Sequence, residues 1–123
     1  MVNEHQTPID ATSFFSALDA HPVTVVKFGT NWCAPCRVWD TYMGTLAASF
    51  ESQGVGFKKV DTDDHFNRGG AFFEKPATQA MLETIGEKPT AIPTIVVLKG
   101  RQRIGVVVGC SVPGVRRLIE QAL

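Results

Sequence analysis

The sequence predicts an α/β fold, and two observations support this class. Apolar runs rich in β-branched residues alternate with segments in which apolar residues recur every three or four positions, as expected for strands alternating with helices. The chain turns at Gly100-Arg101 between the last two predicted strands, and this short connection makes them an antiparallel pair. With 123 residues the chain is long enough to bury a hydrophobic core, and we expect residues 1–123 to form one domain.

The chain begins with a polar segment and a short helix. Residues 1–9 are polar and contain Pro8, so we expect irregular backbone or at most an edge strand there. Asp10 or Thr12 can cap a helix that follows. The apolar face of this helix carries Phe14, Phe15 and Leu18. The helix should end at His21, because the residue before a proline avoids helical geometry.

A buried strand and the longest helix come next. The run Val23–Phe28 is apolar and β-branched apart from Lys27, which predicts a central strand. The residues that predict the buried face of the helix are Val38, Trp39, Tyr42, Met43, Leu46, Ala47 and Phe50. The polar residues on its other side are Asp40, Thr41, Thr45 and Glu51. Gly54 is a suitable residue to end the helix.

The middle of the chain is the least regular part. Residues 55–60 predict a second strand anchored by Phe57, and residues 62–91 form a long connection. Within this connection a helix is expected from about Pro76 to Ile85. The residues expected to face inward are Ala80, Met81 and Ile85.

The C-terminal part contains the antiparallel pair and a final helix. Residues 92–98 predict a strand that opens at a proline, a tolerated position. Residues 104–108 predict its partner, and Ser111 or Val112 can cap the last helix. The apolar face of that helix carries Val115, Leu118, Ile119 and Ala122.

Two cysteines stand where the first long strand gives way to the longest helix, in Trp32-Cys33-Ala34-Pro35-Cys36. Backbone N–H groups at a helix start lack partners within the helix, and the helix dipole adds positive charge, so a thiolate is favoured there. Pro35 suits the first helical turn. We therefore expect Cys33 to be exposed and to attack, and Cys36 to be shielded and to resolve the mixed disulfide.

The alternatives for this pair are inert buried thiols or half of a zinc site. Zinc takes four ligands in structural sites, and only Cys110 and three scattered histidines remain to complete one. We therefore expect redox chemistry and no metal. Three cysteines, an odd number, also do not make a disulfide framework.

Composition and charge argue against several classes of partner. Twelve basic and twelve acidic residues give a net charge of zero, so we expect no nucleic acid partner. No apolar run approaches the length of a bilayer span, so we expect no membrane partner. The first residues lack the charged and then apolar pattern of a secretory signal, which favours the cytoplasm. A mature domain without its leader would look the same.

Four segments, taken in order, resemble the thioredoxin family along nearly the whole chain. Residues 28–36 resemble its active-site segment, and residues 59–63, Lys-Val-Asp-Thr-Asp, resemble the end of its next strand. Ile92-Pro93-Thr94 resembles its cis-proline loop, and Val108-Gly109 resembles the glycine loop that completes its substrate groove. A Cys-x-x-Cys alone is a weak signal, but together with the other three segments in this order it is a specific one. The resemblance implies the thioredoxin fold, a central mixed β-sheet flanked by helices on both faces.

The resemblance also implies a set of site residues and partners. It implies that Cys33 and Cys36 are catalytic and that a cis peptide joins Ile92 to Pro93. The residues implied for the substrate surface are Trp32, Ala34, Pro35, Ile92, Pro93 and Gly109. It further implies no bound cofactor, protein substrates that carry disulfides, and a reductase that restores the dithiol. Cys110 follows Gly109 directly, so it is either an accessory thiol on the same face or a small residue that fills space.

The chain departs from the family pattern at three points. Ala34 replaces the usual glycine, and segment 62–91 is longer than the usual connection. Lys27 stands on the strand where the family usually carries a buried acid that is thought to manage the proton of the inner cysteine.

We expect Lys27 to be at least partly buried near Cys36, with Lys59 on the same side, and both to tune the redox couple. Asp61 is the candidate counter-ion. A charged Lys27 would stabilise the reduced thiolates, whereas a neutral one could take the proton from Cys36. The alternative is that Lys27 reaches along the strand to water.

These observations predict a thiol–disulfide oxidoreductase that reduces protein disulfides. One alternative is a thiol oxidant or isomerase of an oxidising compartment, which a Lys27 that stabilises the thiolates would favour. The other is a binding module of the same fold that docks a partner through segment 62–91.

Overall fold

The computed structural model describes residues 8–30, 32–62, 76–86, 89 and 91–123. The elements in chain order are β1 (Pro8–Ile9), α1 (Ala11–Ala20), β2 (Val23–Gly29), α2 (Ala34–Phe50), the 3₁₀ turn η2 (Glu51–Gln53), β3 (Val55–Asp61), α5 (Pro76–Ile85), β4 (Thr94–Lys99), β5 (Gln102–Val108) and α6 (Val112–Ala122).

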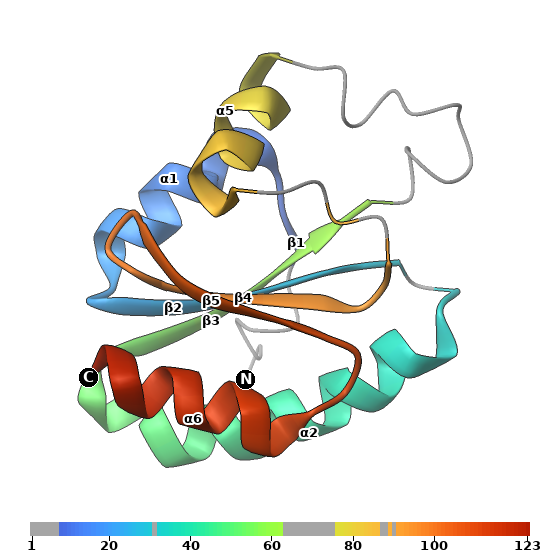
Figure 1. Ribbon diagram of the computed structural model, residues 1–123, viewed down its shortest axis with the longest axis vertical. Coiled ribbons are helices and arrows are strands. Elements are labelled where there is room, and N and C mark those ends of the chain that lie inside the picture. The colour runs from blue at the N-terminus through green and yellow to red at the C-terminus, as the bar shows by residue number, and fades with distance from the viewer. Residues whose placement is uncertain (1–7, 31, 63–75, 87–88, 90) are drawn as a thin grey trace.

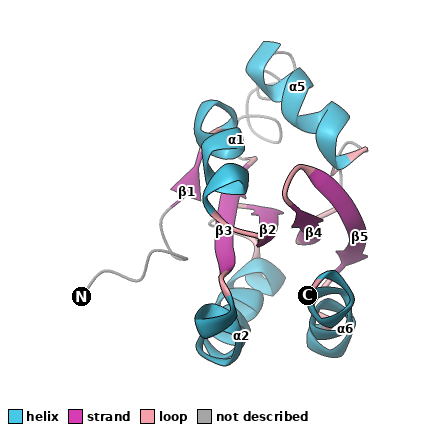
Figure 2. Cartoon of the chain, turned by 90° about the vertical axis from the view of Figure 1, so that its left-hand side faces the viewer, coloured by secondary structure: helices cyan, strands magenta, loops and turns pink. Residues whose placement is uncertain are grey.

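The strands form one mixed sheet in the order β1-β3-β2-β4-β5. β1, β3 and β2 run parallel, whereas β4 is antiparallel to both β2 and β5. Helices α1 and α5 cover one face of the sheet, and α2 and α6 cover the other (Figures 1 and 2). The predicted α/β class, with a mixed sheet between two helical layers, is confirmed.

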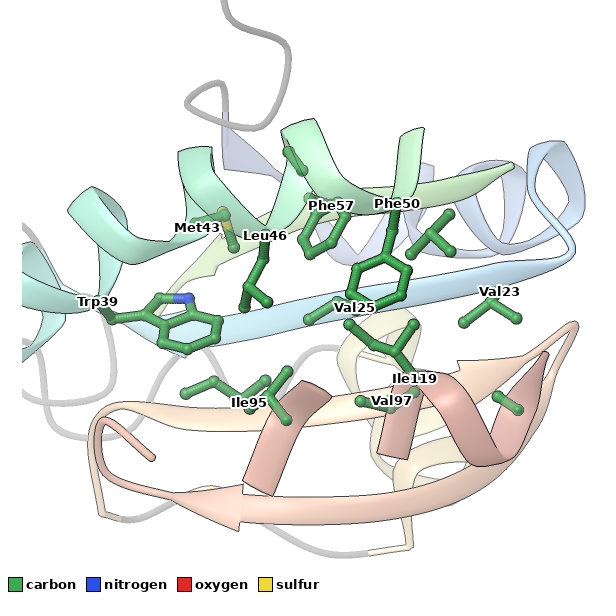
Figure 3. Close-up of a cluster of buried hydrophobic side chains, with 14 residues drawn as sticks. Val23, Val25, Trp39, Met43, Leu46, Phe50, Phe57, Ile95, Val97 and Ile119 are labelled. Carbon is green, nitrogen blue, oxygen red and sulfur yellow. The ribbon is translucent and has the colours of Figure 1, made fainter. Parts of the chain in front are cut away.

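The core beneath α2 and α6 follows the alternation of side chains along the strands. Val23 and Val25 of β2 point to this side, whereas Val26 and Phe28 point to the side of α1 and α5. Figure 3 shows the α2 side chains meeting the sheet and α6; its labelled residues include Trp39, Met43, Leu46, Phe50, Ile95, Val97 and Ile119. Burying one such side chain stabilises the fold by roughly 1.5–3 kcal/mol.

Helix α2 forms as predicted, but its buried face is narrower than its apolar pattern indicates. Val38 and Tyr42 were expected inward and are 49% and 45% exposed. The sheet covers only the stripe that carries Trp39 and Met43, and Val38 and Tyr42 lie beside that stripe. Asp40 was expected on the solvent side and is instead half-buried.

Helix α5 has the predicted bounds, Pro76–Ile85. Met81 and Ile85 are buried as expected, but Ala80 is exposed and Thr78 takes the third inward position. Thr78, Met81 and Ile85 are three and four residues apart, so they form one stripe that excludes Ala80. The rest of segment 62–91, on which the binding-module alternative depends, lies largely outside the described residues.

The strand predicted from Ile92 begins two residues later, at Thr94. The peptide between Ile92 and Pro93 is cis, as predicted. A proline has no N–H to donate to a neighbouring strand, so the ladder starts beyond it.

Three loops leave the sheet at the same edge because of the register of β4. Thr94 pairs with Phe28 at the end of β2 and with Val108 at the end of β5. The loops that follow β2, precede β4 and follow β5 therefore lie side by side, at the right-hand edge of the sheet in Figure 1. All three carry residues of the predicted site, and the loop after β2 leads into the Cys33–Cys36 segment.

The N-terminus of α1 supplies a stability prediction. Asp10 accepts a hydrogen bond from the Ser13 backbone N–H at 2.8 Å, and the Ser13 hydroxyl accepts one from the Asp10 N–H at 3.1 Å. These contacts with Ser13 hold the pKa of Asp10 below its ordinary value of 3.8. The stabilisation is therefore present above that value and is lost as the pH falls through the folded-state pKa.

We expect Asp10→Ala to lower the free energy of unfolding by about 1 kcal/mol at pH 7. Urea unfolding at several pH values measures this difference, which should shrink as the pH falls below the ordinary Asp pKa. Asp10→Asn keeps an acceptor without a charge and serves as the control, with most of the stability retained at pH 7. A loss in Asp10→Ala that is the same at pH 7 and pH 3 would contradict this account.

Candidate active site

Cys33 and Cys36 lie where β2 passes into α2, and they form a disulfide. Cys33 is the N-cap of α2, Pro35 lies in its first turn, and Cys36 follows on the same turn. The Cys36 backbone N–H donates a hydrogen bond to Cys33 Sγ at 3.2 Å. This donor and the positive end of the helix dipole both favour a thiolate at Cys33 once the disulfide is reduced.

The two sulfurs differ in accessibility less than predicted. Cys33 is 6% exposed and Cys36 is fully buried. The expectation of an exposed Cys33 is therefore wrong for the disulfide form, because its sulfur is bonded to the buried Cys36. The order of the two residues, with Cys36 the more shielded, is the one predicted.

The predicted substrate residues lie on the first turn of α2 and in the three loops that meet at this edge of the sheet. Trp32 is 55% exposed, and Ala34 and Pro35 are also exposed on the first helical turn. The cis-proline loop places Pro93 in the interior and leaves Ile92 half-buried.

Gly109 ties the loop after β5 to the cis-proline loop. Its backbone N–H donates a hydrogen bond to the Pro93 carbonyl at 2.8 Å. Its φ is +94°, a conformation that residues with a Cβ rarely adopt. The backbone at this position is therefore held close to Pro93 in a shape that favours glycine.

Cys110 contacts the active-site turn directly. Its Sγ donates a hydrogen bond to the Pro35 carbonyl at 3.0 Å, so it touches the residue between the two redox cysteines. Its thiol is free and half-exposed, and its side chain also packs against the core beneath α6. The location is the one expected of an accessory thiol, and the packing is the one expected of a space-filling residue.

A partly buried charged cluster lies near Cys36. Lys27 is 4% exposed, and its Nζ donates a hydrogen bond to Asp40 Oδ1 at 2.6 Å. Lys59 pairs in register with Lys27, and its Nζ lies 4.0 Å from Asp40 Oδ2. The predicted burial of Lys27 is confirmed, and the alternative in which it reaches water is wrong. The counter-ion that Lys27 has is Asp40 rather than the predicted Asp61.

Gly29 allows the Cys36 sulfur and the Lys27 side chain to approach the same point. A Cβ at residue 29 would lie 2.6 Å from Cys36 Sγ and 3.6 Å from Lys27 Cε. The sulfur and the end of the lysine stem therefore border one small space. The Gly29 carbonyl accepts a hydrogen bond from the Thr62 N–H at 2.9 Å, which ties the end of β2 to the residue after β3.

Sequence reasoning missed Asp40 and Gly29 as parts of the site. Asp40 lies four residues after Cys36, so the two share one side of the helix, and this spacing was the available signal. Gly29 is not one of the glycines with positive φ. Its role therefore follows only from the position of the Cys36 sulfur beside it.

The described residues contain neither a candidate metal site nor a membrane-spanning helix. No group of three or more His, Cys, Asp and Glu side chains there could hold a metal ion. No helix in the same part of the chain is long and apolar enough to cross a membrane.

Known proteins share both the sequence pattern and the fold. The pattern of the family described as Thioredoxin matches residues 5–72. A thioredoxin H-type of Fagopyrum esculentum is 34% identical over 98 residues, which cover 78% of this chain and 68% of the relative. A thioredoxin of Echinococcus granulosus is 28% identical over 114 residues, covering 91% and 89%. The crystal structure of the short form of spinach chloroplast thioredoxin f superposes with a TM-score of 0.69 at 21% identity, covering 94% of this chain and 91% of that one.

The family match spans more than half of the chain and includes both cysteines. The superposition shows that the fold is the thioredoxin fold. The chain therefore belongs to the thioredoxin family of thiol–disulfide oxidoreductases and carries its Cys-x-x-Cys pair as Cys33 and Cys36.

Proposed function

We propose that this protein reduces disulfides in other proteins, with Cys33 as the attacking sulfur and Cys36 as the resolving sulfur. The observation that carries the proposal is the placement of Cys33 at the N-cap of α2, bonded to a fully buried Cys36 on the same turn. The helix start favours the thiolate of the outer cysteine, and burial keeps the inner one from meeting the substrate.

The reaction takes place in two exchanges. The Cys33 thiolate attacks one sulfur of the target disulfide, forms a mixed disulfide and releases the other target sulfur as a thiolate. The Cys36 thiolate then attacks Cys33 Sγ, which re-forms the internal disulfide and releases the second target thiolate. Two electrons have passed from the protein to the target, and a partner reductase must return them.

The proposed substrate surface is formed by the loops around the disulfide. It comprises Trp32, Ala34, Pro35, Ile92, Pro93 and Gly109. The exposure of Trp32 and the alignment of three loops at one sheet edge support this surface. An extended target segment beside Ile92 would lie next to Cys33, where its disulfide can be attacked.

The reductive direction is supported by the relatives, which are named thioredoxins. A cytoplasmic location suits the reductive direction, since that compartment keeps thiols reduced and can supply electrons to a disulfide reductase. One observation favours the oxidant or isomerase alternative. The buried Lys27 near Cys36 would stabilise reduced thiolates, which makes a disulfide more oxidising.

The equilibrium of the Cys33–Cys36 pair with glutathione decides between these directions. For a reductase we expect the pair to remain oxidised at glutathione ratios that correspond to about −220 to −260 mV, the cytosolic poise. The fraction of protein dithiol, trapped by acid and alkylation, measures the equilibrium. In parallel, dithiothreitol-driven insulin reduction should fall to background in Cys33→Ser. A pair that is mostly dithiol under those buffers would support the oxidant instead.

The roles of the two sulfurs are tested by trapping. We expect Cys36→Ser to accumulate a mixed disulfide between Cys33 and a disulfide-containing target, because the resolving thiolate is absent. Non-reducing electrophoresis and peptide mass spectrometry detect it. Cys33→Ser is the matched control and should accumulate none at Cys36. A mixed disulfide at Cys36 in the Cys33→Ser protein would reverse the assignment.

Cys110 is proposed as an accessory thiol that accepts glutathione. In the oxidised protein it is the one cysteine of the three that is not in the disulfide, so a reagent can address it selectively. Oxidised glutathione should transfer one glutathionyl group to Cys110 and release reduced glutathione, as measured by intact mass. Cys110→Ala should take up none. If the oxidised protein also takes up none, Cys110 only fills space beside Pro35.

A further inference from the structure

The partly buried ion pair near Cys36 joins a strand to a helix. Lys27 lies on β2 and Asp40 on α2, and Nζ and Oδ1 are 2.6 Å apart. A lysine held this closely by a carboxylate is an ammonium, since charge-assisted hydrogen bonds of this length are the short and strong ones. Of the two versions of Lys27 considered from the sequence, the contact supports the charged one.

The end of the Lys27 side chain and the resolving sulfur both approach Gly29. Lys27 Cε and Cys36 Sγ both border the space that Gly29 leaves open. Cys36 is fully buried, so water cannot solvate its thiolate. A cation beside it is the available source of stabilisation for that negative charge.

The charged groups near the Cys36 sulfur come from three elements. β2 contributes Lys27, β3 contributes Lys59 and the half-buried Asp61, and α2 contributes Asp40. Asp61 pairs in register with Gly29, so it belongs to the same neighbourhood. Among these groups Asp40 contacts Lys27 at 2.6 Å, and it lies one helical turn after Cys36 on the same side of α2.

We propose that Asp40 is a positioning residue for the resolving step, which holds the Lys27 ammonium beside Cys36 so that the Cys36 thiolate forms in its buried place. This inference rests on the proposed exchange at Cys33 and Cys36. In the step, the Cys36 thiolate attacks Cys33 Sγ, the new internal disulfide forms, and the target sulfur leaves and takes up the proton that Cys36 lost. Lys27 stays protonated throughout and supplies only charge.

The resolving step can be timed with an aromatic disulfide, 5,5′-dithiobis(2-nitrobenzoate), in stopped flow. Attack by Cys33 releases the first thionitrobenzoate at a rate proportional to reagent concentration. Attack by Cys36 on the adduct releases the second at a rate independent of that concentration. The Cys110→Ala background removes the third thiol from the signal. Rates measured from pH 5 to pH 9 give the pH profile of each phase.

We expect Lys27→Met to slow the second phase at pH 7 by roughly tenfold or more, because a neighbouring opposite charge shifts such a titration by about one to three pH units. The midpoint of the pH profile should move upward, and the first phase should change little. Asp40→Ala should act in the same direction, and the double variant should be no slower than Lys27→Met alone. Asp40→Asn keeps an acceptor oxygen and should be slowed less than Asp40→Ala.

The sign of the Asp40 effect separates positioning from simple electrostatics. If Asp40 acted only as a negative charge near Cys36, its removal would speed the second phase in both the Ala and the Asn variant. Either that result or an unchanged second phase in Asp40→Ala overturns the proposal. Equilibria with glutathione give a second readout, in which Lys27→Met and Asp40→Ala should both favour the disulfide by about tenfold, close to 30 mV.

Two matched variants control for the loss of a charge elsewhere. Asp19→Asn removes a carboxylate that also pairs with a base, Arg101, at 2.7 Å, but at the opposite end of β2 on α1. Lys58→Met removes a half-buried lysine next to Lys59 whose strand position faces the other side of the sheet. Both should keep the second phase within about twofold of the starting protein, and a larger slowing in either would overturn the assignment to this cluster.

Folding and the proposed function are checked in the same experiment. Thermal unfolding shows whether each variant is folded, and if Asp40→Ala is not, Asp40→Asn carries the test, with slowing expected and acceleration overturning the proposal. A starting protein without the concentration-independent phase would overturn both this inference and the exchange mechanism. A normal second phase that no cluster variant alters would overturn this inference alone.

Discussion

Because Thr94 pairs with Phe28 of β2 on one side and with Val108 of β5 on the other, the chemistry of this protein is confined to one edge of the sheet. β4 lies between β2 and β5 and is antiparallel to both, so its start lies level with their ends. The cysteine turn, the cis-proline and Gly109 are far apart in the sequence and are brought together by this row of pairs. The hydrogen bond from Gly109 to Pro93 then fixes the two later loops to each other.

Much of the fold could be predicted because each element satisfies a local rule. The spacing of apolar residues and the residues at the helix ends located α2 and α5. Asp10 and Ser111, each one of two candidate caps, are the residues that cap α1 and α6. The buried faces of the helices were predicted less well than the helices themselves. Val38 and Tyr42 satisfy the helical period, but the width of the sheet and the position of α6 determine how much of a helix is covered, and neither can be derived from a single helix.

Some residues of the site could be predicted from the sequence and others could not. Cys33, Cys36 and the cis peptide before Pro93 were predictable because they belong to motifs that are contiguous in sequence. The partner of Lys27 was not, since a buried lysine can be neutralised from any element packed above it. Asp61 was the nearest acid along the neighbouring strand, whereas Asp40 reaches Lys27 from the helix that crosses above β2.

The absence of a side chain at residue 29 has a consequence for how this chain can evolve. At Gly109 the backbone conformation itself favours glycine, but at Gly29 the constraint is the sulfur that occupies the adjacent volume. A lineage that lost Cys36 would free this volume and could accept alanine or a larger residue at position 29. Once such a residue was present, its side chain would clash with the sulfur of a cysteine restored at position 36. Loss of the inner cysteine would therefore be difficult to reverse, because the two positions are coupled through shared space rather than through any bond.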